Sequence, residues 1–180
     1  MLVRGPATEQ ALRRADLSAV RILHFATHAV MDDRSLPRNM LVLSPSAGND
    51  GFVGPDELSA LSLRDALVVL SGCSTVGGIV LGGEGLRGLT APLLEAGARA
   101  VVATHWAIGD QSTLPFVDRF YSHMAAGMNV GAALRRAKLD AIRDSITPAV
   151  WAAFSLVGDG AMKVQLRPVS TAPLPWVRSN

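Results

Sequence analysis

Cys73 and His28 are the two residues whose side chains could together carry out covalent chemistry. The chain has one cysteine and four histidines. A thiolate is the nucleophilic form of cysteine, but a thiol with an unperturbed pKa of about 8.5 is mostly protonated at neutral pH. A neighbouring imidazole can help to ionise the thiol and can then protonate a departing amine. These residue types therefore predict nucleophilic attack on a carbonyl group.

Two short apolar segments must position this pair. Residues 20–26 and 66–71 are rich in apolar side chains, which is typical of strands covered on both faces. His28 follows the first segment and Cys73 follows the second. Parallel strands end at the same edge of a sheet, so both side chains would emerge at one rim. Backbone N–H groups at Ala29 and Cys73 are then placed to receive the oxyanion.

The rest of the chain alternates between strand and helix patterns. Further strands are expected at 40–43, 52–53, 99–104 and 151–157, and helices at 7–18, 54–58, 86–96, 111–126 and 130–145. The polar residues 31–39 predict a loop. Strands that alternate with helices favour an α/β sandwich on a mostly parallel sheet, because each crossover helix covers a sheet face.

Composition limits the class of protein and its partners. A chain of 180 residues is long enough for one domain with a sizeable core. Lys and Arg exceed Asp and Glu by only two (17 − 15), so no nucleic-acid partner is expected. No stretch reaches the roughly 18 apolar residues of a membrane span. A single cysteine and an amino-terminal segment without a signal-like apolar core predict a cytoplasmic protein.

Each reactive residue has a simpler interpretation when it is taken alone. Cys73 could be a small buried apolar residue, and His28 a hydrogen-bonded loop histidine. Ser71 or Ser74 could serve as a nucleophile in an α/β frame, but the Gly-x-Ser-x-Gly elbow of such serine hydrolases is missing from the sequence. The cysteine and histidine pair is therefore preferred.

The glycines and the other histidines predict no bound group. The glycine-rich segment 77–85 lacks the Gly-Lys-Ser/Thr ending with which a P-loop grips phosphate. No two histidines share the spacing of metal ligands on one helix, and there is no second cysteine. By strand alternation His24 is expected to be a hydrogen-bonded core residue. We therefore expect neither a metal nor another cofactor.

Several sequence blocks, in order, resemble the CHAT family, whose members are caspase-like peptidase domains usually fused to tetratricopeptide repeats. The blocks are HFATHA at 24–29, LSGCST at 70–75, GGEGL at 82–86, AGARAVV at 96–102, WAIGD at 106–110 and WAAFSLVGD at 151–159. His28 and Cys73 take the catalytic positions of the family. Their separation of 45 residues (73 − 28) is also close to the interval of about 50 in caspases.

The resemblance implies a caspase-like three-layer sandwich over residues 1–162, followed by a Pro-rich, loosely ordered tail at 163–180. It implies a cysteine endopeptidase for limited proteolysis of a protein or peptide substrate. Candidate substrate-binding residues are Glu84, Trp106 and Asp110, although Asp110 is equally well explained as a helix N-cap. An upstream tetratricopeptide-repeat region or a regulatory protein is an expected partner.

Two features keep a second interpretation open. Ala29 stands where the family usually has glycine, and a methyl group there could crowd the N–H that binds the oxyanion. The chain is also expected to begin after the family's amino-terminal strand, and so to be incomplete at that end. The alternative function is a catalytically impaired caspase-like scaffold that acts as a regulatory or protein-interaction module.

Overall fold

The computed structural model describes residues 7–32, 38–71 and 88–166. The strands are β1 (Ile22–Phe25), β2 (Ala29–Asp32), β3 (Arg38–Val42), β4 (Phe52–Val53), β5 (Ala66–Leu70), β6 (Ala98–Thr104) and β7 (Phe154–Gly158). The helices are α1 (Glu9–Arg14), α2 (Pro55–Ser59), α3 (Thr90–Glu95), α4 (Asp110–Ala125), α5 (Val130–Arg143) and α6 (Pro148–Trp151).

A four-stranded sheet forms the centre of the molecule, with strand order β1-β5-β6-β7. β1, β5 and β6 are parallel neighbours, and β7 pairs antiparallel with β6. Every residue of β5 is buried, as its continuous apolar sequence predicts for a strand covered on both faces. The predicted α/β class with a mostly parallel sheet is confirmed.

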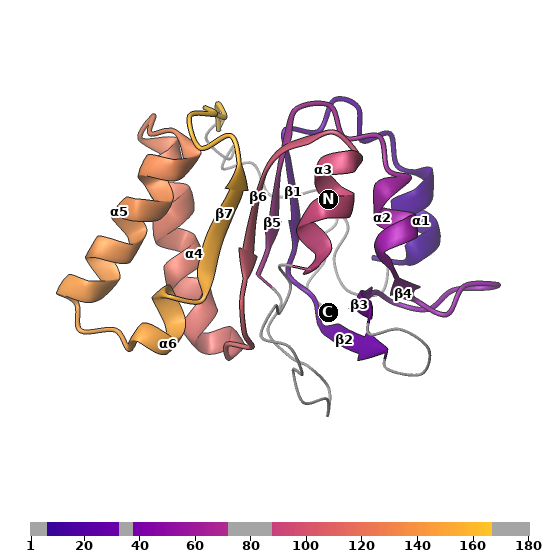
Figure 1. Ribbon diagram of the computed structural model, residues 1–180, viewed down its shortest axis with the longest axis horizontal. Coiled ribbons are helices and arrows are strands. Elements are labelled where there is room, and N and C mark those ends of the chain that lie inside the picture. Colours follow the sequence, from indigo (N-terminus) through magenta and orange to yellow (C-terminus); the bar gives the residue numbers. More distant parts are fainter. Residues whose placement is uncertain (1–6, 33–37, 72–87, 167–180) are drawn as a thin grey trace, which may run out of the picture.

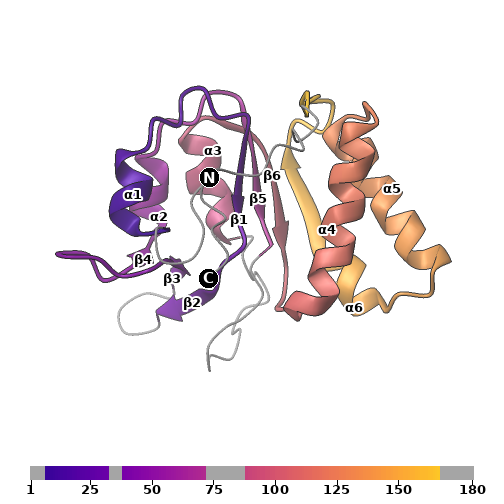
Figure 2. The ribbon, with the colours of Figure 1, turned by 180° about the vertical axis from the view of Figure 1, so that it is seen from behind.

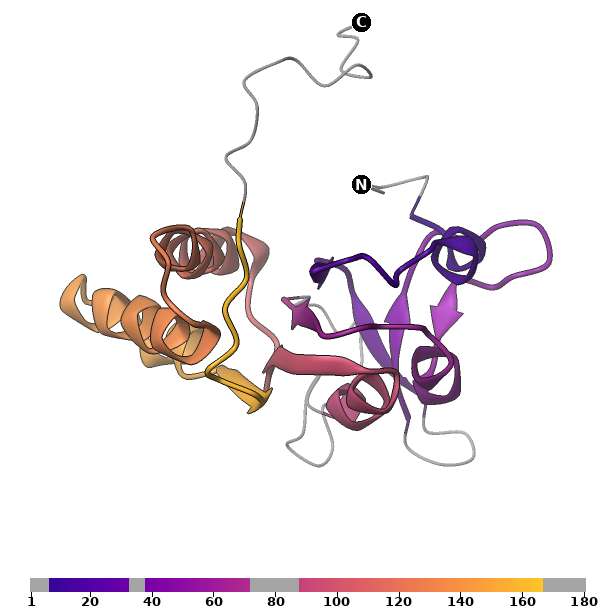
Figure 3. The same cartoon turned by 90° about the horizontal axis from the view of Figure 1, so that it is seen from above.

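Helices cover both faces of this sheet, which gives three layers (Figure 1). Leu67, Val69, Ala100 and Val102 face a core that they share with α4, α5 and α6. The alternate residues of β5 and β6 face a second core with α1, α2 and α3. Figure 2 shows the same layers from behind, and Figure 3 shows from above that α4 and α5 lie on the opposite side of the sheet from α1 and α2.

A small antiparallel sheet, β2-β3-β4, corrects one prediction from the sequence. The segment 31–39 was expected to be a loop, but Ala29–Asp32 and Arg38–Val42 pair as strands. Backbone hydrogen bonds between two chain segments stabilise this pairing, and these bonds do not depend on apolar side chains. The strand expected at 52–53 is confirmed as β4, which is antiparallel to β3.

The predicted closing strand at 151–157 is divided between two elements. Its first residue, Trp151, ends the short helix α6, and β7 begins only at Phe154. Pro148 stands in the first turn of α6, where the missing N–H costs no hydrogen bond. Beyond β7, the side chain of Val164 is buried in the core shared with α4 and α5.

A tight turn at Gly97 connects α3 to β6. Gly97 has a φ of +96°, and a Cβ atom there would lie 2.0 Å from the carbonyl oxygen of Leu63. Only glycine fits this position without moving the backbone.

In the described ranges of the chain, no helix is long and apolar enough to cross a membrane.

Candidate functional site

The carboxyl ends of β1 and β5 lie side by side. Phe25 is the register partner of Leu70, and the Ser71 N–H extends the ladder by donating to the Phe25 carbonyl over 3.1 Å. His28 comes three residues after Phe25, and Cys73 comes three residues after Leu70. Cys73 itself lies outside the described residues. The two segments predicted to position the pair are therefore parallel neighbours that leave the sheet at one edge.

His28 lies in the turn from β1 to β2. Its carbonyl oxygen accepts a hydrogen bond of 2.8 Å from the Val42 N–H. The hydroxyl of the preceding residue, Thr27, donates to the Val42 carbonyl. These contacts attach the turn to β3, while the His28 residue itself is exposed to solvent. The arrangement holds the backbone and leaves the imidazole accessible.

Ala29 is the first residue of β2 and the register partner of Leu41. Because the Val42 N–H donates to the carbonyl of His28, the preceding residue, the alternation of an antiparallel ladder directs the Ala29 N–H away from β3. The Ala29 side chain packs against the core on the α1–α3 side of the sheet. Its methyl group therefore packs against this core. Its N–H points away from β3 and is oriented to donate to a group outside the small sheet.

Trp106 and Asp110 follow β6, which is parallel to β5 and ends at the same edge. Trp106 is 41% exposed, and its indole Nε1–H donates to the Ala149 carbonyl over 2.8 Å. Asp110 is exposed and is the first residue of α4, with Gly109 as the N-cap. The predicted N-cap role of Asp110 is therefore off by one residue, although a carboxylate in the first turn still favours the helix dipole. Glu84 lies outside the described residues.

A chain of three hydrogen-bonded side chains links β1, β5 and α4. His24 Nε2 lies 2.6 Å from Ser71 Oγ, and His24 Nδ1 lies 3.1 Å from the Tyr121 hydroxyl. The His24 and Tyr121 rings are in contact, with centroids 5.7 Å apart. His24 was predicted to be a core residue, but it is exposed on β1, an edge strand of the described central sheet. Both of its nitrogens are nevertheless hydrogen-bonded, as that prediction required.

Desolvation changes the acidity of two members of this chain. Although the His24 residue keeps an exposed surface, partial desolvation of its ring lowers the pKa of the imidazole and favours the neutral form. Burial also raises the pKa of Tyr121, so the phenol keeps its proton. Sequence reasoning did not identify this cluster. The available signal was a histidine and a serine in two apolar strands, at positions facing the same side.

A second feature is an open basin of about 740 Å³ lined by α1, α2 and the β3–β4 region. Its lining residues are Glu9, Arg13, Met40, Ser46, Gly48, Asn49, Asp50, Phe52 and Glu57. The described residues of the predicted site, His28, Ala29, Trp106 and Asp110, are not among them. The basin is therefore distinct from the strand-end site.

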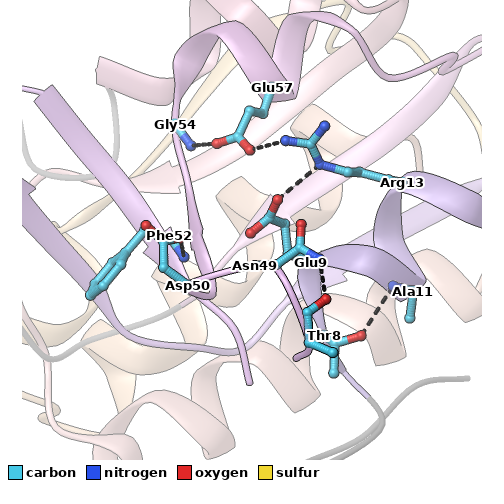
Figure 4. Close-up of polar contacts among 10 residues, drawn as sticks. Thr8, Glu9, Ala11, Arg13, Asn49, Asp50, Phe52, Gly54 and Glu57 are labelled. Atoms are coloured by element: carbon cyan, nitrogen blue, oxygen red, sulfur yellow. Dashed lines mark hydrogen bonds and ion pairs between the residues drawn. The ribbon is translucent and has the colours of Figure 1, made fainter. Parts of the chain in front are cut away.

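Three charged groups of this basin, Glu9, Arg13 and Glu57, bind one another. Arg13 Nε lies 2.9 Å from Glu9 Oε1, and the same guanidinium contacts Glu57 Oε1 at 2.5 Å. The other oxygen of Glu57 accepts the Gly54 N–H at the start of α2, over 2.7 Å. Figure 4 shows Arg13 between the two carboxylates. We therefore assign Arg13 a structural role that joins α1 to α2.

The part of the chain that the structure describes contains no set of side chains suited to bind a metal ion. In residues 7–32, 38–71 and 88–166, no three His, Cys, Asp or Glu side chains are grouped closely enough to hold an ion.

The three layers, the mostly parallel sheet and the position of His28 at its carboxyl edge define a caspase-like scaffold of the cysteine-peptidase-related class. The family model for the CHAT domain matches residues 1–159, and the chain belongs to this family. It is also 34% identical over 105 residues to mouse (Mus musculus) tetratricopeptide repeat protein 28. That match covers 57% of this chain and 4% of the relative's length, so the chain spans only a small part of that protein.

Proposed function

We propose that the protein is a cysteine endopeptidase in which Cys73 is the nucleophile and His28 the acid/base partner. The observation that carries the proposal is the equal distance of both residues, in sequence, from the register pair Phe25 and Leu70. Adjacent strands lie about 4.8 Å apart, so two chains that leave them at one edge start close together. From Ser71, the two residues to Cys73 span at most about 7 Å.

The reaction follows from the chemistry of the two groups. The Cys73 thiolate attacks the peptide carbonyl, and the carbonyl oxygen gains the electron pair of the C=O bond. The N–H groups of Ala29 and Cys73 donate to this oxyanion. When the C–N bond breaks, His28 protonates the amine. Water then attacks the thioacyl group, His28 takes the water's proton, and the acid product and the thiolate are released.

Trp106, Asp110 and Glu84 are proposed to line the substrate cleft. Two observations support the first two: both follow β6 at the carboxyl edge, and both are exposed. The Trp106 indole is held by its hydrogen bond to Ala149, so an exposed aromatic surface is presented in one orientation. Such a surface suits an apolar portion of a peptide, while Asp110 favours a basic one.

We further propose that a partner controls access to this cleft in the cytoplasm. The likeness to part of a tetratricopeptide repeat protein supports a repeat region, or a separate regulatory protein, as that partner. The expectation is that a chain carrying such a region cleaves slowly until the region is removed or occupied. If the longer protein cleaves at its maximal rate without any partner, this regulatory proposal is wrong.

A peptide-library digest tests the catalytic proposal. The native chain, Cys73→Ala, His28→Ala and Ser74→Ala are incubated with the library in parallel, and the products are identified by mass spectrometry. Cys73→Ala and His28→Ala should each lower kcat/KM by about a thousandfold or more, since the groups of a catalytic dyad act as a unit. Ser74→Ala should keep most of the activity. Cleavage that survives loss of either Cys73 or His28 would rule out the dyad.

The same digest separates the peptidase from a scaffold without catalysis. A native chain that cuts no peptide, even when joined to its upstream sequence, would favour the regulatory or interaction module. Circular dichroism of each variant shows whether the fold is retained, so that a lost activity is not mistaken for a lost structure.

A further inference from the structure

Among the described residues, β1 contacts Ser71 through two hydrogen bonds, two residues before Cys73 in the sequence. Its N–H donates to the Phe25 carbonyl over 3.1 Å, and its Oγ lies 2.6 Å from His24 Nε2. Only 6% of the residue is exposed. Both contacts come from β1, the strand that leads to His28. The end of β5 is therefore bound to the end of β1 by a backbone contact and by a side-chain contact.

The side-chain contacts continue from His24 to α4. A neutral imidazole has one N–H donor and one acceptor nitrogen. The two nitrogens of His24 pair with different hydroxyl groups, Nε2 with Ser71 Oγ at 2.6 Å and Nδ1 with the Tyr121 hydroxyl at 3.1 Å. One hydroxyl group therefore accepts from the ring N–H, and the other donates to the ring lone pair. The set links α4, through β1, to the end of β5.

Packing alone would not require polar groups at these positions. Leu67 and Val69 occupy the same face of β5 and contact the α4 side of the molecule through apolar surface only. Apolar contacts are not directional, whereas a connected set of hydrogen bonds specifies one orientation of each group. The polar chain therefore specifies the orientation of Ser71 more closely than an apolar residue would.

We propose that Tyr121 and His24 are positioning residues that hold Ser71, two residues before Cys73 in the sequence, and thereby support the reactivity of the Cys73 thiol. This inference rests on the proposed function. The two side chains act through Ser71 and the two residues that follow it, without touching the substrate. Tyr121 lies on α4, the helix that begins at Asp110, so the same helix presents a candidate substrate residue and supports the nucleophile.

The single cysteine allows a test that does not depend on a known substrate. Alkylation of the intact chain by iodoacetamide is followed by mass spectrometry between about pH 5 and pH 9, a range that includes the ordinary thiol pKa of about 8.5. The variants are Tyr121→Phe, His24→Asn and His24→Gln, with His28→Ala as the reference for a lost partner. Ser122→Ala is the matched control, because it removes an exposed hydroxyl from the next residue of α4.

The native thiol should react at pH 6, where an ordinary thiol is almost fully protonated. Tyr121→Phe should slow this reaction about three- to tenfold, the effect of one lost hydrogen bond. His24→Asn should slow it further, because its amide reaches the Tyr121 hydroxyl but not Ser71. His24→Gln should recover part of the rate, because its amide can replace Nε2. Ser122→Ala should react as the native chain does.

The outcomes separate the inference from the proposed function. If His28→Ala slows alkylation at pH 6 but Tyr121→Phe and His24→Asn react at the native rate, the positioning role is wrong and the dyad stands. If the Tyr121 and His24 variants react faster than the native chain at every pH, the cluster only limits access of the reagent to the thiol. The positioning role is again wrong. If the native profile is that of an ordinary thiol and His28→Ala does not change it, the proposed function fails, and the positioning role fails with it.

Discussion

Phe25 of β1 and Leu70 of β5 are register partners in parallel strands, and the hydrogen bond from the Ser71 N–H to the Phe25 carbonyl continues the ladder beyond Leu70. This relationship aligns the two segments that carry His28 and Cys73. Each of these residues follows its strand by the same number of residues, so neither segment has a longer path from the sheet. The following predictions test this alignment and the packing around it.

Replacing His28 with cysteine should allow an intramolecular disulfide with Cys73. A disulfide needs Cα atoms about 4.4–6.8 Å apart, which adjacent strand ends can supply. Arg21→Cys is the control, since Arg21 precedes β1 at the other edge of the sheet. Mild oxidation of dilute protein, followed by intact mass and peptide mapping, measures the cross-link. Equal cross-linking in the two variants would contradict the proposed proximity.

Gly97→Ala should destabilise the protein far more than Gly127→Ala. Both glycines have positive φ, +96° and +91°, but an added Cβ would meet the Leu63 carbonyl at Gly97 and open space at Gly127. The backbone conformation alone costs about 1–2 kcal/mol in each case. The clash should raise the loss at Gly97 to about 3 kcal/mol or more. Urea unfolding measures both, and equal losses would show that the turn relaxes around the methyl group.

Asp140 should make the protein sensitive to acid. His123 Nε2 lies 2.6 Å from Asp140 Oδ2, and this hydrogen bond, with Arg136 and Arg143 nearby, lowers the pKa of the carboxyl. A lowered native pKa contributes stability that is present above the unfolded value of about 3.9 and is lost as pH falls through the native value. Thermal unfolding from pH 7 to pH 2 should therefore show a smaller acid-dependent loss in Asp140→Asn.

The control for Asp140→Asn is Asp118→Asn, which removes an exposed carboxyl from α4. It should leave the acid-dependent loss of the native chain almost unchanged. An Asp140→Asn profile that runs parallel to the native one would show that the hydrogen bond to His123 has no net effect on the free energy of unfolding.

Ionisation of the Tyr121 phenol should lower the free energy of unfolding at high pH. Burial raises the pKa of its phenol, so the native state holds a proton that the unfolded chain loses above about pH 10. This contribution is complete below the unfolded pKa and is lost as pH rises toward the native value. Because Tyr121 is the only tyrosine, tyrosinate absorbance reports on it alone. Tyrosinate absorbance near pH 10 in the folded chain would contradict the predicted shift.

The residue pattern alone was sufficient for the main strands of the central sheet. The apolar segments at 66–71 and 99–104 became β5 and β6, because a strand covered on both faces needs apolar side chains throughout. The order of His28 and Cys73 after their strands also follows from sequence. The strand pair β2 and β3 did not, because its pairing depends on backbone contacts between segments that local residue types do not encode.

The sequence by itself determined which residues could react and which segments carry them, since side-chain chemistry and strand periodicity are local properties. Only the tertiary structure decided that β1 and β5 are direct parallel neighbours, and that Tyr121 of α4 reaches His24 and Ser71. These contacts join residues up to 97 positions apart. They arise because burial of the apolar side chains on both faces of one sheet brings distant segments into contact. This packing involves the whole chain and is not encoded in any one segment.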